Sequence, residues 1–440
     1  MSVNTGFDVD AAVKKLVMTD DIKVKETVAL EIQAQAKAKG IFLASIHDVY
    51  MARGKGQGKA FTVPAVNLRS LTYYLARAIF RVAKRLNAGA FIFEIAKSEM
   101  GYTNQPPIEY SAVVLAAAIK EGYSGPVFVQ GDHCQIKATA YVANKAKEVG
   151  GLKDMVADCI VAGFYNIDID SSTTVDLSRP SLTEQQRDNF EVCAEMTKHI
   201  RSLQPKGIDI SVGGEIGEVG HKNSTVEELT AFMDGYNNSL PKGVEGLSKI
   251  SVQTGTSHGG VVLPNGKIAE VKVDFDTLKA LSAAGQKKYG LGGAVQHGAS
   301  TLPDEAFHKF PQVNTLEVHL ATNFQNKILD SKLFPKDLSV KIVEWCKVNC
   351  ASERKPTDTE EQFIYKARKR ALGQFKKEIY GLPESVKEGI AAEIEKNFEF
   401  LFKQLDVNDT KDFVTKIIKP VHAAIGLRHT QTHLDGEGDD

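Results

Sequence analysis

Cysteine, net charge and long apolar runs are all scarce in this chain. Its five cysteines are scattered without a framework of pairs, which favours a reducing, cytoplasmic setting. No apolar run approaches the roughly 20 residues that span a bilayer, and the amino-terminal residues lack the apolar core of a signal peptide. The net charge of −1 gives no general argument for nucleic acid or a membrane surface as a partner.

Glycine-rich dinucleotide motifs and flexible linkers are missing as well. No G-x-G-x-x-G follows the first strand-like run, which argues against an open, doubly wound sheet. No low-complexity segment divides the 440 residues, whose 42% hydrophobic and 25% charged content is ordinary for a globular protein. A chain of this length can bury a large core, so one large α/β domain with added segments is expected.

Eight short apolar runs, each followed by a helix-like stretch, carry the fold prediction. They are rich in Val, Ile and Phe and too short for helices. Strand and helix alternating eight times indicates a (β/α)8 TIM barrel, with the doubly wound sheet as the competing architecture. The expected strands cover 60–67, 89–96, 126–133, 163–172, 208–216, 249–256, 292–300 and 315–322.

The segments that flank the barrel are expected to be helical. The prediction divides the chain into an N-terminal helical segment (1–55), a catalytic barrel (56–335) and a long C-terminal helical extension (336–440). In the first of these, one helix is expected near 23–40, followed by a shorter one. Helices of the extension are expected near 337–350, 359–380, 383–405 and 409–425.

Four histidines stand at the downstream ends of four expected strands: His133, His258, His297 and His319. The active site of a TIM barrel lies at the carboxyl ends of its strands, so these imidazoles should meet at one rim. A catalytic zinc takes three protein ligands and leaves one position open. A histidine on a strand is usually a core residue, but several at matching strand ends favour a metal enzyme.

Two acids accompany the histidines. Asp132 directly precedes His133 and is interpreted as a proton acceptor that faces the substrate; the alternative is an Asp-His pair that caps the next helix. Glu215 ends the fifth expected strand and opens a glycine-rich loop. It is predicted to be a fourth or alternative metal ligand, and the alternative is an exposed acid in a surface loop.

The run HGAST after the seventh expected strand suggests a phosphate site. The hydroxyls of Ser300 and Thr301, with a helix expected to begin near Pro303, would form a cradle for phosphate. Barrels often bind phosphate in the loops after strands seven and eight, and Thr322 follows the eighth. A Schiff-base lysine is disfavoured, because Lys249 begins its strand and no other strand carries a central lysine.

Together these motifs resemble the class II, metal-dependent fructose-bisphosphate aldolases and their tagatose-bisphosphate relatives. The resemblance covers about 60–335 and comprises, in order, FTVPAVN, GDH, GGEIGEVG, TSHGG and QHGAST. It implies His133, His258 and His297 as zinc ligands, Glu215 beside a second zinc position, and Asp132 at the hydroxyl of the scissile bond. It also implies a substrate pocket at Asn67, and a phosphate and monovalent-cation site lined by Gly259, Gly298, Ser300 and Thr322.

The chain departs from the family pattern at several positions, among them the loop after Glu215, where Lys222 and Asn223 stand in place of the expected paired acids. Gln130 replaces the first histidine of the HxDH motif, and Glu94 stands where a polar amide is expected. Ala96 replaces a phosphate-binding serine. On the eighth strand, His319 replaces the asparagine that faces the enediolate, and Ala321 replaces an aspartate that contacts phosphate. The resemblance therefore implies the metal centre more firmly than the substrate.

The expected function is a zinc-dependent aldolase that cleaves a phosphorylated ketose, with fructose 1,6-bisphosphate as the first substrate to test. One alternative is a class II aldolase of other specificity, such as tagatose bisphosphate, which the departures at Glu94, Ala96, His319 and Ala321 favour. Another is a non-catalytic barrel subunit of an aldolase complex. The resemblance implies a homo-oligomer, while the net charge and the lack of long apolar runs argue against nucleic acid and membrane partners. His319 and Glu218 are left as candidates to protonate the enediolate.

Overall fold

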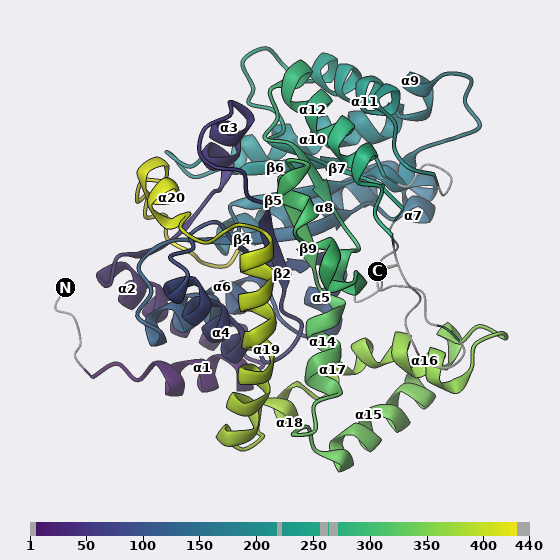
Figure 1. The fold of residues 1–440 in the computed structure, drawn as a ribbon. Coiled ribbons are helices and arrows are strands. Elements are labelled where there is room, and N and C mark those ends of the chain that lie inside the picture. Colours follow the sequence, from purple (N-terminus) through teal and green to yellow (C-terminus); the bar gives the residue numbers. More distant parts are fainter. Residues whose placement is uncertain (1–5, 218–221, 256–262, 264–271, 429–440) are drawn as a thin grey trace.

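Eight parallel strands close into a barrel in the computed structural model, which describes residues 6–217, 222–255, 263 and 272–428 (Figure 1). The ring is completed where the first barrel strand pairs with the last, Val63 beside Glu317. The expected (β/α)8 TIM barrel is therefore confirmed. Its strands are β2 (Val63–Asn67), β3 (Ile92–Ala96), β4 (Gly125–Gln135), β5 (Asn166–Asp170), β6 (Ser211–Glu215), β7 (Lys249–Val252), β8 (Ala294–Gln296) and β9 (Glu317–Leu320).

Helices surround these strands (Figure 1). Residues that precede them often supply caps: the hydroxyl of Thr225 accepts a hydrogen bond from the backbone N–H of Glu228 at the start of α11. The helices between the strands are α4 (Thr72–Arg85), α5 (Lys97–Tyr102), α6 (Pro107–Lys120), α7 (Ala138–Ala143), α8 (Lys145–Val161), α9 (Leu182–Gln185), α10 (Arg187–Leu203), α11 (Val226–Ser239), α12 (Phe275–Tyr289) and α13 (Lys309–Gln312), and α14 (Thr322–Leu329) follows β9.

A ninth strand precedes the barrel, where the sequence predicted only helices. Besides α1 (Val9–Met18), α2 (Ile22–Ala38) and α3 (His47–Gly54), the front segment contains β1 (Ile41–Ala44). β1 pairs with the first residues of β4, whereas β5 pairs with the later ones. The Asn166 side chain joins these strands, donating to the carbonyls of Ala44 and Val129. A four-residue strand at the foot of a barrel has too little periodicity to be recognised in a sequence.

The C-terminal residues are largely helical and pack back against the barrel, but the helix expected over 409–425 ends at Ile417. The helices are α15 (Lys336–Asn349), α16 (Glu360–Ala367), α17 (Ala371–Gln374), α18 (Lys376–Tyr380), α19 (Glu384–Gln404) and α20 (Lys411–Ile417), so the helix expected over 359–380 is broken into pieces. α19 packs along α4. Arg77 and Arg81 of α4 form ion pairs with Glu388 and Glu395 of α19. The division at residues 55 and 335 stays a prediction.

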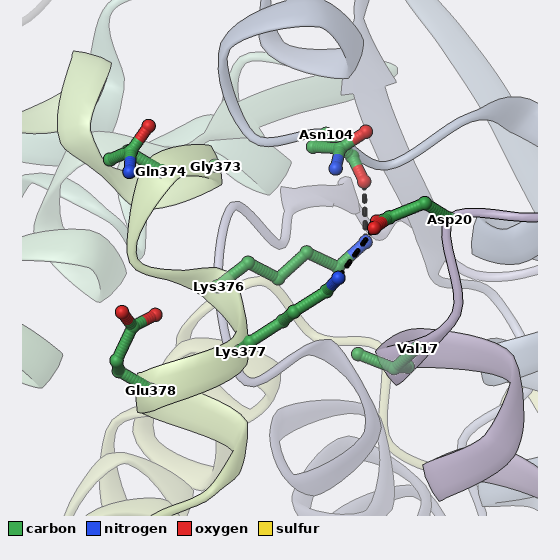
Figure 2. Close-up of a pocket in the computed structure, with 8 residues that line it drawn as sticks. All are labelled: Val17, Asp20, Asn104, Gly373, Gln374, Lys376, Lys377 and Glu378. Carbon is green, nitrogen blue, oxygen red and sulfur yellow. Dashed lines mark hydrogen bonds and ion pairs between the residues drawn. The ribbon is translucent and has the colours of Figure 1, made fainter.

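A buried carboxylate joins a helix of the N-terminal segment to a helix of the C-terminal extension. Glu109 of α6 pairs with Lys25 of α2 at 2.5 Å and with Lys376 of α18 at 2.6 Å. Beside this cluster, α1 and α18 line a cavity of about 460 Å³, where Lys377 pairs with Asp20 and Lys376 donates to the carbonyl of Asn104 (Figure 2). None of the expected site residues lines this cavity. Nowhere in the described ranges is there a helix of the length and apolarity needed to cross a membrane.

The interior of the barrel is unusually polar. TIM-barrel interiors are normally filled by branched apolar side chains. Here the ammonium of Lys249 on β7 is buried at the centre and donates to Asp168 at 2.9 Å, Gln130 at 2.8 Å and Glu317 at 2.6 Å. Burial lowers the pKa of Lys249, but the charges of Asp168 and Glu317 outweigh it and raise that pKa. A positive charge therefore lies directly beneath the rim.

Candidate active site and metal centre

Three of the four predicted histidines meet at the carboxyl ends of the strands. The rings of His133 and His297 have centroids 4.3 Å apart, and those of His297 and His319 lie 3.9 Å apart. All three side chains are buried. The fourth, His258, lies outside the described residues, as does Gly259. Three strands distant in sequence, β4, β8 and β9, thus deliver imidazoles to one place.

A break in β4 turns Asp132 and His133 into the same space. Consecutive residues of a regular strand point to opposite faces, which would keep these two side chains apart. The β4–β5 register shifts between Gly131 and Cys134, and His133 adopts a left-handed backbone with φ 39°. The Oδ1 atom of Asp132 consequently lies 3.8 Å from the Nε2 atom of His133. Asp132, His133 and His297, hereafter the histidine group, offer ligand atoms that all lie within 4.8 Å of one another.

A second group contains Glu215, which was predicted as a metal ligand, and Asp170, for which no role was predicted. The Nδ1 atom of His133 lies 3.4 Å from Asp170 and 3.7 Å from Glu215, and these three form the Glu215 group. Glu215 is mostly buried and does not project from a surface loop. The position of Asp170 at the end of IDID, one strand after His133, is the sequence signal that could have identified it.

The two acids of the Glu215 group titrate very differently. Burial raises the pKa of Glu215 to about 8, and the neighbouring charge of Asp170 acts in the same direction. Burial also acts to raise the pKa of Asp170, but hydrogen bonds and charge from His133 outweigh it and bring that pKa to about 2. Asp170 is further fixed by Ser172 and Gln135. Asp170 is therefore the permanent negative charge of the group.

His319 lies deeper in the barrel than would be expected of a residue that only contacts substrate at the rim. Its Nδ1 atom is 3.1 Å from both Glu94 and Asp132, and its Nε2 atom is 2.6 Å from Glu317. Burial lowers the pKa of His319, but the charges of Glu94 and Asp132 outweigh it and raise that pKa well above its usual value. Glu94, Asp132 and His319 form the inner group, whose ligand atoms also lie within 4.8 Å of one another.

Asp132 belongs to both the histidine group and the inner group, and Asn67 holds it in place. The amide nitrogen of Asn67 donates to Asp132 at 2.9 Å and to Glu99 at 2.9 Å. Burial acts to raise the pKa of Asp132, but the nearby charges of His133 and His319 keep it well below its usual range. Asp132 is therefore ionised. The sequence placed Asn67 at the pocket, and the structure puts it against this carboxylate.

The expected phosphate loop has a different local structure from the one predicted. Gly298 has φ 69°, which suits glycine, and it starts a 3-10 turn over Ala299–Thr301. The hydroxyl of Ser300 accepts a hydrogen bond from the backbone N–H of Ala321 at 2.6 Å. No α-helix begins near Pro303, because only a 3-10 turn over Asp304–Ala306 follows it. Pro303 would be tolerated in the first turn of a helix, but Pro311, eight residues later, lacks the N–H that a continuous helix would need.

A buried arginine near this loop was missed by the sequence analysis. Arg69 follows β2 and pairs with Glu99 at 2.5 Å. Its guanidinium also reaches the side chains of Gln325 at 3.1 Å and Thr322 at 3.5 Å. The structure thus places Thr322, a predicted substrate residue, beside a fixed cation. The side chain of Thr301 lies outside what the structure describes.

The donor set suits a divalent metal ion. Imidazole nitrogens and carboxylate oxygens are the usual protein ligands of zinc and of other first-row divalent ions. In the histidine group they converge from β4 and the end of β8 in a buried space at the rim. By contrast, Lys249 is held as an ammonium by two carboxylates, so it is no nucleophile for an imine.

Comparison with solved structures finds the same fold in other proteins. Among solved structures, the chain is similar to a probable tagatose 6 phosphate kinase from Sinorhizobium meliloti 1021, with 12% identity, TM-score 0.54 and coverage of 80% of this chain and 99% of that one. It is also similar to the fructuronate-tagaturonate epimerase UxaE from Cohnella laeviribosi, with 9% identity, TM-score 0.53 and coverage of 86% and 84%. Such low identities show the shared fold alone.

A fructose-bisphosphate aldolase from Campylobacter jejuni is 16% identical, with TM-score 0.49 and coverage of 84% of this chain and 96% of that one. No curated protein matches the sequence. The family model described as "Fructose-bisphosphate aldolase class-II" matches residues 51–400, which is most of the chain. The protein therefore belongs to the class II fructose-bisphosphate aldolase family, a family of carbon–carbon lyases that is generally metal-dependent and acts on phosphorylated sugars.

Proposed function

We propose that the protein is a zinc-dependent aldolase that cleaves fructose 1,6-bisphosphate into dihydroxyacetone phosphate and glyceraldehyde 3-phosphate. The observation that carries this proposal is the histidine group, in which Asp132 lies beside two converging imidazoles. His133, His297 and, outside the described residues, His258 would hold the zinc. Glu215 with Asp170 would hold a second ion at the Glu215 group.

A bound zinc ion would stabilise the negative charge that develops on the substrate when the carbon–carbon bond breaks. Asp132 accepts the proton of the hydroxyl across that bond, because it is ionised and faces the metal-binding space. Asn67 keeps the carboxylate in position through its hydrogen bond. The sugar phosphate would bind near Gly298, Ser300 and Thr322, where Arg69 adds a positive charge.

A different sugar phosphate is the second candidate substrate, and the inner group favours it. Glu94 and His319 stand where the resemblance implies uncharged amides, and Ala96 and Ala321 offer no side-chain hydrogen bond to phosphate. Tagatose bisphosphate differs from fructose bisphosphate only in stereochemistry, so a changed set of polar contacts can select between them.

A panel of ketose phosphates tests these proposals on the purified protein. We expect retro-aldol cleavage that a chelator abolishes, that zinc restores, and that borohydride added with substrate leaves intact. Preference within the panel then distinguishes fructose from tagatose bisphosphate. Protein that binds no metal and cleaves none of the panel would instead support a non-catalytic subunit. A homo-oligomer and a cytoplasmic location stay predictions, which sedimentation and cell fractionation test.

A further inference from the structure

We infer that the inner group, formed by Glu94, Asp132 and His319, is an additional site for a divalent first-row metal ion. It lies below the histidine group and shares Asp132 with it. It differs from the Glu215 group, which lies on the other side of His133 and uses Asp170 and Glu215. Binding of this ion does not depend on the identity of the sugar.

The first support is that only one oxygen of each of the two carboxylates, Glu94 and Asp132, is hydrogen-bonded. One oxygen of each is fixed by an amide: Gln130 donates to Glu94 Oε2 at 2.8 Å, and Asn67 donates to Asp132 Oδ2 at 2.9 Å. The other oxygens, Glu94 Oε1 and Asp132 Oδ1, are buried and make no hydrogen bond. Buried carboxylate oxygens without hydrogen bonds are costly unless an ion neutralises them.

The orientation of the Gln130 amide determines that its nitrogen, and not its oxygen, faces Glu94. Its amide oxygen accepts from the Lys249 ammonium at 2.8 Å, and an ammonium can only donate. The nitrogen of Gln130 must therefore face Glu94, whose free oxygen then points toward His319. Carboxylates held by fixed amide donors are typical of the residues that surround protein metal sites.

The second support is the geometry around His319. Its Nδ1 atom lies 3.1 Å from both Glu94 Oε1 and Asp132 Oδ1, yet it makes no hydrogen bond to either. A single N–H placed between two oxygens can align well with at most one of them. Two ligands bound about 2.1 Å from one ion, at roughly 90–110° to each other, lie about 3.0–3.4 Å apart. The separations at His319 match that spacing.

Glu317 completes the arrangement on the far side of the ring. Metal-binding histidines usually direct their second nitrogen to a carboxylate. Glu317 Oε1 lies 2.6 Å from His319 Nε2 and is itself held by the Lys249 ammonium at 2.6 Å. The Lys249 ammonium also neutralises Asp168, so the group of Asp168, Glu317 and His319 already contains a cation. Among the described residues, no lysine or arginine forms an ion pair with Glu94 or Asp132.

The ligand chemistry narrows the choice of ion. Two carboxylates and one imidazole suit Mn²⁺ or Zn²⁺ better than the all-oxygen preference of Ca²⁺. With ions in both the inner and histidine groups, Asp132 would bridge them as in two-metal centres, whose ions lie about 3.5–4 Å apart. If the proposed function also holds, a filled inner site competes with proton transfer for Asp132, so excess metal should slow turnover.

Manganese binding to the metal-free full-length protein tests the site. We expect Glu94→Gln to lose one Mn²⁺ equivalent, or to bind it at least about 100-fold more weakly, compared with wild type. His319→Asn should lose the same equivalent. Asp168→Asn is the matched control, because it changes a buried acid of the same interior that Lys249 already neutralises, and it should keep the wild-type stoichiometry.

Spectroscopy and diffraction give readouts that do not require activity. In wild type loaded with Mn²⁺, electron paramagnetic resonance should show coupled spins, and Glu94→Gln should show only isolated ones. Anomalous diffraction from wild-type crystals with Mn²⁺ should place an ion between Glu94 and His319, whether or not the variants fold. Equal stoichiometry and affinity in wild type and both variants, or no anomalous peak at that position, would overturn the inference. Wild-type protein that binds manganese as expected but cleaves no ketose phosphate would contradict only the proposed function.

Discussion

Asp132 and His133 are neighbours on one strand, yet Asp132 Oδ1 lies 3.8 Å from His133 Nε2 on the same side of it. The register shift in β4 and the left-handed backbone at His133 produce this proximity. A non-glycine residue in that conformation costs about 1–3 kcal/mol, and such strain is most often found at functional sites. The same strand end thereby supplies both a candidate metal ligand and a candidate proton acceptor.

Replacing His133 should remove more metal than replacing His297. His133→Ala deletes a ligand from both the histidine group and the Glu215 group, whereas His297→Ala affects only the first. We expect each variant to cleave ketose bisphosphate at least about 10³-fold more slowly, since the metal contributes several kcal/mol of charge stabilisation. Metal content by mass spectrometry and kcat measure the two effects. Full activity in metal-free His297→Ala would contradict the assignment.

Metal affinity should fall as the solution becomes more acidic. Burial raises the pKa of Glu215 to about 8, so below that pH the carboxyl holds a proton that a metal ion must displace. Between pH of about 8 and about 6 we expect up to a tenfold loss of affinity per pH unit for each displaced proton. Calorimetric titration in two buffers measures the released proton. Glu215→Gln should bind more weakly and show a flatter pH dependence.

The same shift in the pKa of Glu215 should make the metal-free fold more stable in acid, whereas metal binding becomes weaker there. The pKa of Glu215 is raised from 4.5 to about 8, so the folded state binds its proton more tightly than the unfolded state does. The contribution of Glu215 to stability is therefore complete below pH 4.5 and is lost as pH rises through about 8. Urea unfolding of metal-free Glu215→Gln should lack this loss, which the wild type would show.

Removing the buried ammonium of Lys249 should destabilise the barrel strongly. Lys249→Met leaves Asp168 and Glu317 buried without their cation, which costs about 3–5 kcal/mol. The exposed pair of Lys288 with Asp234 is the matched control, and Lys288→Met should change stability by about 0–1 kcal/mol. Urea midpoints compare the two. Equally small effects of both substitutions would show that the central ion cluster contributes little to the stability of the barrel.

Glu109 should contribute strongly to holding the N-terminal and C-terminal helices together. Glu109→Gln would leave Lys25 and Lys376 without their shared carboxylate, and we expect a loss of about 3–5 kcal/mol in unfolding free energy. Asp20→Asn removes the exposed pair with Lys377 seen in Figure 2 and should cost about 0–1 kcal/mol. Thermal melts of the two variants provide the comparison, and equal midpoints would refute the expectation.

The residues at the ends of the strands could be predicted well, because closing a barrel brings the carboxyl ends of all its strands to one rim. Apolar runs ending in His133, Glu215, His297 and His319 had to meet at one rim once eight strands closed. Which neighbours each side chain would meet could not be derived in the same way. The depth of His319 beside Glu94 depends on strand tilt and stagger, which local sequence does not encode.

The amino-acid sequence by itself determined the number of barrel strands, their order and the residues placed at their ends, because hydrophobic periodicity and chain connectivity are local properties. Only the tertiary structure decided that Lys249 would neutralise the barrel centre, that β1 would pair with β4, and that Asp132 would serve two groups. These outcomes depend on long-range pairing and on charges from several strands meeting in one buried volume, where each ion must find its partner.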